Sequence, residues 1–187
     1  DESKPGIVYD TSDSNFEMKG VLTLNTPSDS GIILYVGDSY NITWTRLGGI
    51  SNVRIEYSTD GGSTYPNSVV DSTPAVSGTY PWPVPDKILG NNLRVKVSDV
   101  DNVSVFDTSD NNFEILGKVI LNAPNGGQNW PVGSTKQIQW TPTGTFTYVR
   151  LEHSIDAGSS YLSPPIVSQI AAGTSGFMQS FDWTVPD

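Results

Sequence analysis

Gly37-Asp-Ser-Tyr-Asn-Ile-Thr-Trp44-Thr returns later in the chain as Gly133-Ser-Thr-Lys-Gln-Ile-Gln-Trp140-Thr, and Trp140 follows Trp44 by 96 positions. The next block keeps the same spacing. Val53-Arg-Ile-Glu-Tyr-Ser-Thr-Asp60-Gly-Gly-Ser-Thr-Tyr returns as Val149-Arg-Leu-Glu-His-Ser-Ile-Asp-Ala-Gly-Ser-Ser-Tyr161. A period of this length is too long for a solenoid unit and suits a β-sandwich of ~100 residues. The duplication therefore predicts two copies of one domain.

The duplicated blocks have the alternation of half-buried strands. Tyr40, Ile42 and Trp44 alternate with polar residues, and the segment 53–58 alternates in the same way. Further strands are predicted at 21–24, 32–36, 79–84, 93–97 and 105–115, and no segment has a helical period. The predicted fold class is all-β, with tandem Ig-like or fibronectin-III-like β-sandwich repeats of about 97 residues.

The period also predicts the domain boundaries. Residues 1–20 resemble the end of the complete copy, where 106–117 matches 9–20. They are therefore expected to be the closing strand of a preceding repeat, or a donor strand. Residues 21–117 form the complete sandwich, and residues 118–187 form an incomplete one that lacks its last two strands. Two explanations stay open. Either the chain is a window from a longer array, which we favour, or neighbouring chains complete one another.

Bulk composition excludes several classes of protein. The chain has 187 residues, no cysteine and a net charge of −10, with a pI near 4.3. The absence of cysteine excludes disulfides and thiolate metal sites. The negative charge disfavours binding to nucleic acid and anionic lipid. No apolar run is long enough to span a membrane, and no leader is visible, so an exported chain would be a mature fragment.

Four motifs together resemble a known family. They are Pro124-Asn-Gly-Gly-Gln-Asn-Trp-Pro-Val-Gly133, Ile138-Gln-Trp-Thr141, the 149–158 block and Trp183-Thr-Val-Pro186. This string is similar to the KNH-like Ig-fold repeat of fungal cell-wall glucan-assembly proteins and of very large bacterial surface proteins. The resemblance implies an exported, often glycosylated, non-catalytic module that occurs in tandem. The complete copy departs from the pattern at residues 28–34.

The aspartates are the candidate ligands for a cation. A carboxylate in a glycine turn such as Asp60-Gly-Gly accepts backbone N–H groups, as in the Asp-box hairpin of sialidase blades, and this role is structural. Other aspartates gather near predicted loops, where oxygen ligands suit calcium, but the EF-hand spacing is absent. A solvated acidic hairpin with Asx turns is the alternative. These residues are Asp10, Asp13, Asp99, Asp101, Asp107 and Asp110.

Other candidate sites are few. Asn41-Ile-Thr and Asn102-Val-Ser are N-glycosylation sequons on predicted accessible positions. Trp130 has no counterpart in the other copy, so it is the candidate for an exposed aromatic that stacks on a sugar, or for a lid over one end of the sandwich. His153 replaces Tyr57 and is expected at the core or its rim. With one histidine and no cysteine, no catalytic set is predicted.

The expected function is structural. The sequence predicts a non-enzymatic repeat segment of an extracellular filament, stalk or surface-layer protein. Its completion by strands from neighbouring repeats or chains is one of the two explanations left open above. The alternative is a carbohydrate- or protein-binding accessory module of a secreted multidomain protein or adhesin. Expected partners are copies of itself, neighbouring repeats and glycans, without nucleic acid or membrane insertion. No cofactor is expected apart from the possible calcium.

Overall fold

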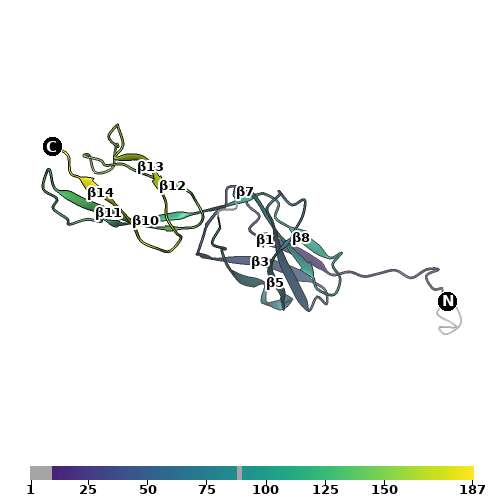
Figure 1. Cartoon of the computed structure of the whole chain (residues 1–187). Helices are drawn as coiled ribbons and strands as arrows, with labels where there is room; N and C mark the ends of the chain where they lie inside the picture. The colour runs from purple at the N-terminus through teal and green to yellow at the C-terminus, as the bar shows by residue number, and fades with distance from the viewer. Residues whose placement is uncertain (1–9, 88–89) are drawn as a thin grey trace.

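The computed structural model describes residues 10–87 and 90–187, and it shows an all-β protein. Its strands form two units, which follow one another along the molecule in Figure 1. We call residues 21–117 the first repeat and residues 118–187 the second repeat. One short 3-10 turn, Ala75–Ser77, is the helical element of the described residues. None of their helices is long and apolar enough to cross a membrane.

The first repeat is a complete two-sheet sandwich of the Ig-like and fibronectin-III-like type. One sheet has the order β1-β3-β6 and the other β2-β9-β7-β4-β5, with β8 also paired to β7. All pairs are antiparallel except β2–β9, which is parallel. The strands are β1 (Val21–Thr26), β2 (Ile33–Tyr35), β3 (Ser39–Leu47), β4 (Asn52–Ser58), β5 (Asn67–Pro74), β6 (Thr79–Pro83), β7 (Gly90–Asp99), β8 (Phe106–Thr108) and β9 (Phe113–Leu116).

Alternating apolar residues of both sheets fill the core of the first repeat, as the sequence predicts. Ile42, Val53 and Phe113 are buried there with Trp44, whose indole N–H donates to the Ala75 carbonyl at 3.0 Å. A buried indole needs such an acceptor, because an unpaired donor in the core costs stability. The duplicated tryptophan therefore serves packing.

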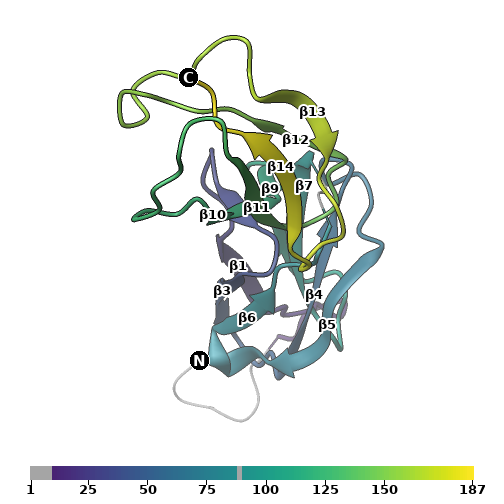
Figure 2. The ribbon, with the colours of Figure 1, turned by 60° about the vertical axis from the view of Figure 1, so that its left-hand side comes forward.

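The second repeat has the same plan with fewer strands. Its sheets are β10-β11-β14 and β12-β13, which Figure 2 shows above the first repeat. The Trp140 indole donates to the Ala172 carbonyl at 3.0 Å, the same bond that Trp44 makes. No described residue after 117 forms a counterpart of β7, β8 or β9. The strands are β10 (Lys118–Ala123), β11 (Thr135–Thr143), β12 (Tyr148–Leu151), β13 (Val167–Ala171) and β14 (Gln179–Thr184).

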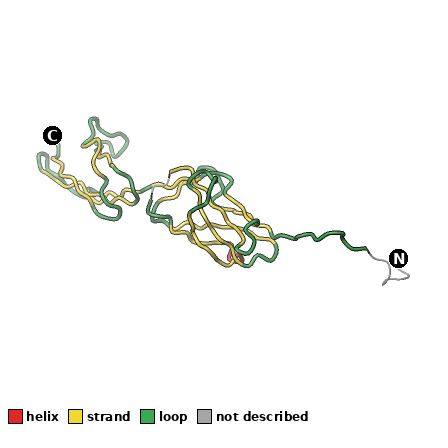
Figure 3. Tube along the Cα trace, turned by 45° about the vertical axis from the view of Figure 1, so that its right-hand side comes forward, coloured by secondary structure: helices red, strands yellow, loops and turns green. Residues whose placement is uncertain are grey.

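Three features differ from the sequence-based expectation. Strand β5 was not predicted, and the predicted closing strand 105–115 is divided into β8 and β9 by a loop. Residues 10–20, expected to be a strand, form coil (Figure 3), because no ladder partner lies beside them in this chain. The remainder of the predicted 1–20 segment, residues 1–9, lies outside the described residues.

Candidate functional site: an open groove and a joint between repeats

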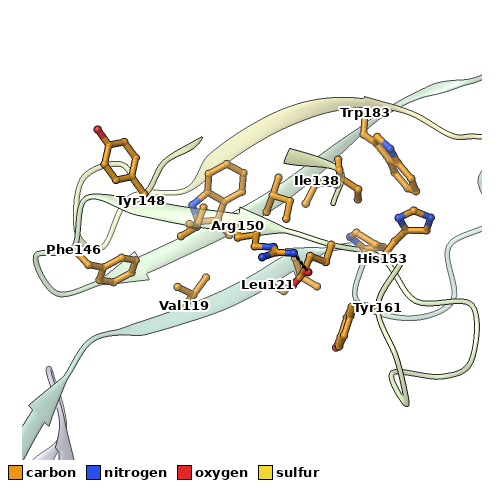
Figure 4. Close-up of a pocket in the computed structure, with 15 residues that line it drawn as sticks. Val119, Leu121, Ile138, Phe146, Tyr148, Arg150, His153, Tyr161 and Trp183 are labelled. Carbon is orange, nitrogen blue, oxygen red and sulfur yellow. Dashed lines mark ion pairs between the residues drawn. The ribbon is translucent and has the colours of Figure 1, made fainter. Parts of the chain in front are cut away.

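An apolar groove lies between the two sheets of the second repeat. It has a volume of about 510 Å³, and Figure 4 shows its side chains arriving from β10, β11, β12 and β14. Arg150 forms an ion pair with Glu152 at 2.7 Å at this groove. Apolar and aromatic residues dominate the lining, among them Val119, Leu121, Ile138, Tyr148, Leu151 and Trp183.

The groove exposes positions that are core positions in the first repeat. Leu24 pairs with Trp44, and Leu121 pairs with Trp140 in the same register. Leu24 is 3% exposed, whereas Leu121 is 45% exposed. In the first repeat, β8 covers β1, and the Leu24 N–H donates to an Asp107 carboxylate oxygen at 2.8 Å. The face is open because no described strand covers it.

Three aromatic rings gather at the end of the groove where β14 carries Trp183. Trp183 lies 6.2 Å from Trp130 and 5.3 Å from His153, measured between ring centroids. Trp130 is half-buried against the second core rather than a free platform. His153 lies at the rim of that core, and its buried Nδ1 has no hydrogen-bond partner among the described residues. A buried unpaired nitrogen is unfavourable.

The two repeats are joined without a linker. Strand β9 ends at Leu116 and β10 begins at Lys118, so Gly117 alone separates them. A Cβ on Gly117 would meet the Phe146 ring at 2.8 Å and the Thr143 carbonyl oxygen at 2.9 Å. Only glycine fits there without displacing the loop after β11. The position is therefore sterically closed.

Two polar contacts cross this joint. Lys118 forms an ion pair with Asp38 and lies over the Tyr35 ring, 5.5 Å from its centroid. The Ser175 hydroxyl contacts both carboxylate oxygens of Asp86 at 2.9 and 3.0 Å. Two separate contacts beside one glycine restrict the relative movement of the repeats.

The start of the first repeat has the same construction. A Cβ on Gly20 would meet Ile50 Cγ1 at 2.7 Å and the Leu47 carbonyl oxygen at 3.0 Å. Just before it, the Glu17 carboxylate accepts a hydrogen bond from the Asn102 amide at 3.3 Å. The Lys19 ammonium donates to the Ser104 hydroxyl, in the same β7–β8 loop as Asn102, at 3.0 Å. Gly20 and Gly117 thus occupy equivalent, sterically closed places directly before β1 and β10.

The predicted calcium ligands are dispersed among structural hydrogen bonds. Asp110 accepts from the Ser28 hydroxyl at 2.8 Å, and Asp99 accepts from the Asp101 N–H at 3.0 Å. Asp10 accepts from the N–H that follows it, in the coil before the first repeat. Within residues 10–87 and 90–187, no group of three or more His, Asp or Glu side chains is placed to hold a metal ion.

The two sequons lie in different surroundings. Asn41 is exposed on β3, facing away from the core. Asn102 is half-buried at the β7–β8 loop, where its Oδ1 accepts from the Ser104 N–H at 3.2 Å and from the Ser104 hydroxyl at 2.7 Å. This is the Asx-type turn geometry that a polar hairpin tip favours.

Asp60 and Asp156, each in a turn that contains glycine, are the acids whose pKa is most strongly lowered among the described residues. Asp60 accepts hydrogen bonds from the Ser58 hydroxyl at 2.6 Å and from the Thr64 hydroxyl and N–H at 2.6 and 2.9 Å. These donors favour the carboxylate and lower the pKa of Asp60 to about 2. Asp156 repeats the network with serine donors, and its pKa is also lowered to about 2.

A second hollow, which the sequence did not indicate, lies on the outer face of the first repeat. It has a volume of about 410 Å³ and is bordered by Tyr65, Phe106, Arg94 and Lys96. The Lys96 ammonium lies 5.0 Å above the Tyr65 ring, and Phe106 is 54% exposed. These residues come from separate strands and a turn, so spacing along the chain does not bring them together.

Comparisons with known proteins do not place the chain in a family. No protein-family model matches it, and no curated protein sequence matches it. Among solved structures, a chain described under "Structures of Clostridium thermocellum CbhA fibronectin(III)-like modules" is similar to this one. The two are 14% identical, the match covers 89% of this chain and 94% of the solved chain, and the TM-score is 0.32. The assignment of this chain as a tandem Ig-like or fibronectin-III-like β-sandwich rests on its own strand order.

Proposed function

We propose that the chain is a non-enzymatic structural segment of an extracellular filament, stalk or surface-layer protein, in which the repeats act as stiff spacers. The joint carries this proposal. Gly117 leaves no free linker, and the Lys118–Asp38 and Ser175–Asp86 contacts connect the two repeats. The equivalent packing at Gly20 supports a joint that recurs along an array.

Surface composition fits this role. Twenty acidic residues against ten basic ones give a net charge of −10, which keeps a long exposed array soluble through mutual repulsion. The resemblance to KNH-like surface repeats, carried by sequence motifs, points in the same direction. The sequons at Asn41 and Asn102 are the positions proposed for glycans on such a surface.

The test of the proposal is the stiffness of the joint. In the intact chain we expect small-angle scattering and NMR residual dipolar couplings to fit one relative orientation of the repeats. Gly117→Val introduces side-chain atoms where even a Cβ would lie 2.8 Å from Phe146, so the two repeats should separate and reorient independently. The matched control is Gly49→Ala, whose Cβ would meet nothing within 4 Å.

Two results would contradict the proposal. Couplings of the unmodified chain that require widely different orientations would show a flexible joint. Unchanged couplings in Gly117→Val, with both repeats still folded, would show that the glycine does not set the geometry.

A binding module is the second candidate, favoured by the hollow beside Tyr65 and Phe106. An aromatic face with adjacent cations suits a sugar ring that carries an acidic group. Binding of acidic oligosaccharides that is lost in Phe106→Ser, and kept in a control substitution of the exposed Val76, would support this role. Absence of binding across a broad glycan array would remove it.

A further inference from the structure

The hollow beside Tyr65 contains a lysine whose charge is neutralised by a neighbouring strand. The Lys96 ammonium, on the outer face of β7, lies 2.9 Å from a carboxylate oxygen of Glu56 on β4. The two residues face each other in the β4–β7 ladder, and their side chains are 25% and 20% exposed. Strands β4 and β8 lie on opposite sides of Lys96, and its side chain lines the hollow. The ion pair therefore keeps a cation at the edge of the hollow.

An exposed aromatic ring lies on the other side of this lysine. Thr108 pairs with Lys96 in the β7–β8 ladder. Phe106 pairs with the residue two positions further along β7, so it lies on the same face as Lys96 and diagonal to it. Diagonal neighbours are about 7–8 Å apart, which is short enough for one sugar unit to meet both side chains. The Phe106 ring is 54% exposed and is available to the apolar face of such a sugar.

The other cation and the other ring of the hollow are fixed in place. Arg94 donates to the Asn112 side-chain oxygen at 2.8 Å and to a backbone carbonyl of the β8–β9 loop at 3.2 Å. A Cβ on Gly62 would meet the Arg94 side chain and the Tyr65 hydroxyl at 3.0 Å, so this turn packs closely on both. The Tyr65 ring, 5.0 Å from the Lys96 ammonium, favours a cation at that position. Lys96 is therefore the cation that can exchange one carboxylate for another.

We propose that Glu56 is an internal competitor for Lys96, and that an acidic sugar binds in the hollow by taking the place of Glu56 on the ammonium. The ligand class is a sugar ring that carries a carboxylate, with one face on Phe106. The ammonium has three donors, but two carboxylates drawn to one unit charge repel each other at close range. The contact with Glu56 and the contact with the ligand therefore weaken each other.

This inference rests on the binding role given above as the second candidate function, and it goes further by naming the residue that limits affinity. The net charge of −10 repels an anionic ligand, so a local cation is needed to hold one. Glu56 offsets that cation in the free protein. All of the residues involved lie between positions 56 and 112, so the complete first repeat supplies the whole site.

The test is calorimetric titration of the full chain with tetrasaccharides of galacturonic acid and of glucuronic acid. The methyl ester of each is the control, because it keeps the rings and removes the charge. We expect the unmodified chain to bind at least one acid, and to bind its ester about tenfold more weakly or less. Glu56→Gln should bind the same acid about two- to fivefold more tightly, the range expected for removing one partly exposed ion-pair partner.

A matched substitution controls for the change of net charge. Asp71→Asn removes one negative charge from β5, where the carboxylate accepts a hydrogen bond from Ser68 rather than from a residue of the hollow. Its affinity for the acid should stay close to that of the unmodified chain, because solvent screens an exposed charge outside the site. Equal gains in Asp71→Asn and Glu56→Gln would show a general charge effect and would contradict competition for Lys96.

A double-mutant cycle tests whether Glu56 acts through the lysine. Lys96→Met alone should weaken binding of the acid about tenfold. Adding Glu56→Gln to Lys96→Met should then give no gain, because no ammonium remains to be released. A gain that persists without Lys96 would refute the proposal. Urea unfolding of each variant shows whether the first repeat is intact.

Two further results would overturn the inference. Unchanged or weaker binding by a folded Glu56→Gln variant would show that the ion pair does not compete, while the binding role itself would stand. Failure of both the unmodified chain and Glu56→Gln to bind either acid would remove the inference together with that binding role. The stiffness of the joint, on which the structural role rests, is measured separately.

Discussion

The duplicated chain offers a matched pair of core substitutions, Leu24→Ala and Leu121→Ala. Both leucines pair with the core tryptophan of their own repeat, but Leu24 is 3% exposed and Leu121 is 45% exposed. Removing a fully buried leucine costs about 2–5 kcal/mol, because the lost transfer energy adds to that of the cavity left behind. We expect Leu24→Ala to destabilise the first repeat by an amount in this range.

Leu121→Ala should cost much less. About half of the Leu121 side chain is already in water, so its lost transfer energy is on the order of 1 kcal/mol. The space vacated opens onto the groove rather than forming a sealed cavity, so no large cavity cost is added. The difference between the two substitutions should therefore be about 1–4 kcal/mol.

Hydrogen exchange under increasing urea, read by mass spectrometry on fragments of each repeat, measures the two unfolding energies separately in one chain. A two-repeat protein need not unfold as one unit, so a single melting temperature does not suffice. Equal losses for the two leucines, or a larger loss for Leu121→Ala, would show that the groove face is covered in the isolated chain and would refute the reasoning.

Three further outcomes are expected. The pKa of Asp60 is lowered to about 2 in the folded state, so its contribution to stability is present above pH ~4 and is lost as the pH falls from ~4 to ~2; Asp60→Asn should reduce the loss of first-repeat stability in urea unfolding over that window. His153→Tyr, which restores the residue of the first repeat and removes a buried unpaired nitrogen, should stabilise the second repeat by about 1 kcal/mol in the same exchange assay. Because Asp107 and Asp110 are occupied by protein donors, exchanging calcium for a chelator should leave the thermal unfolding of the first repeat unchanged within 1 °C or so.

Strands with an apolar inner face could be predicted from the sequence, because alternation and the repeat give the same result. Strand β3, with Ile42 and Trp44 buried, is the clearest case. Strand β5 (Asn67–Pro74) could not, because it is an edge strand with no fully buried residue and two irregularities in its pairing with β4. Its polar sequence gives no alternation to detect.

The joint and the groove were harder to predict for a different reason. Lys118 and Asp38 are 80 positions apart, and nothing in their local sequences indicates that they meet. Trp130 was considered as an exposed platform or as a lid over one end of the sandwich, because it has no tryptophan counterpart. It is half-buried, occupies the position of buried Leu34 and packs on Trp183. Aligning the turn that follows, rather than the residue type, would have placed it against the core.

Comparing the two repeats shows how far the burial of a residue depends on its own type and how far it depends on the strands that cover it. Ile42 and Trp44 keep their burial in the second repeat as Ile138 and Trp140, because apolar residues of β12 and β13 pack against them from the other sheet. Residues that faced β8 and β9 lose it, as the 45% exposure of Leu121 shows. The closing strands therefore complete the wall of the core that covers β1 in the first repeat, and the exposure of Leu121 reflects their share of that enclosure.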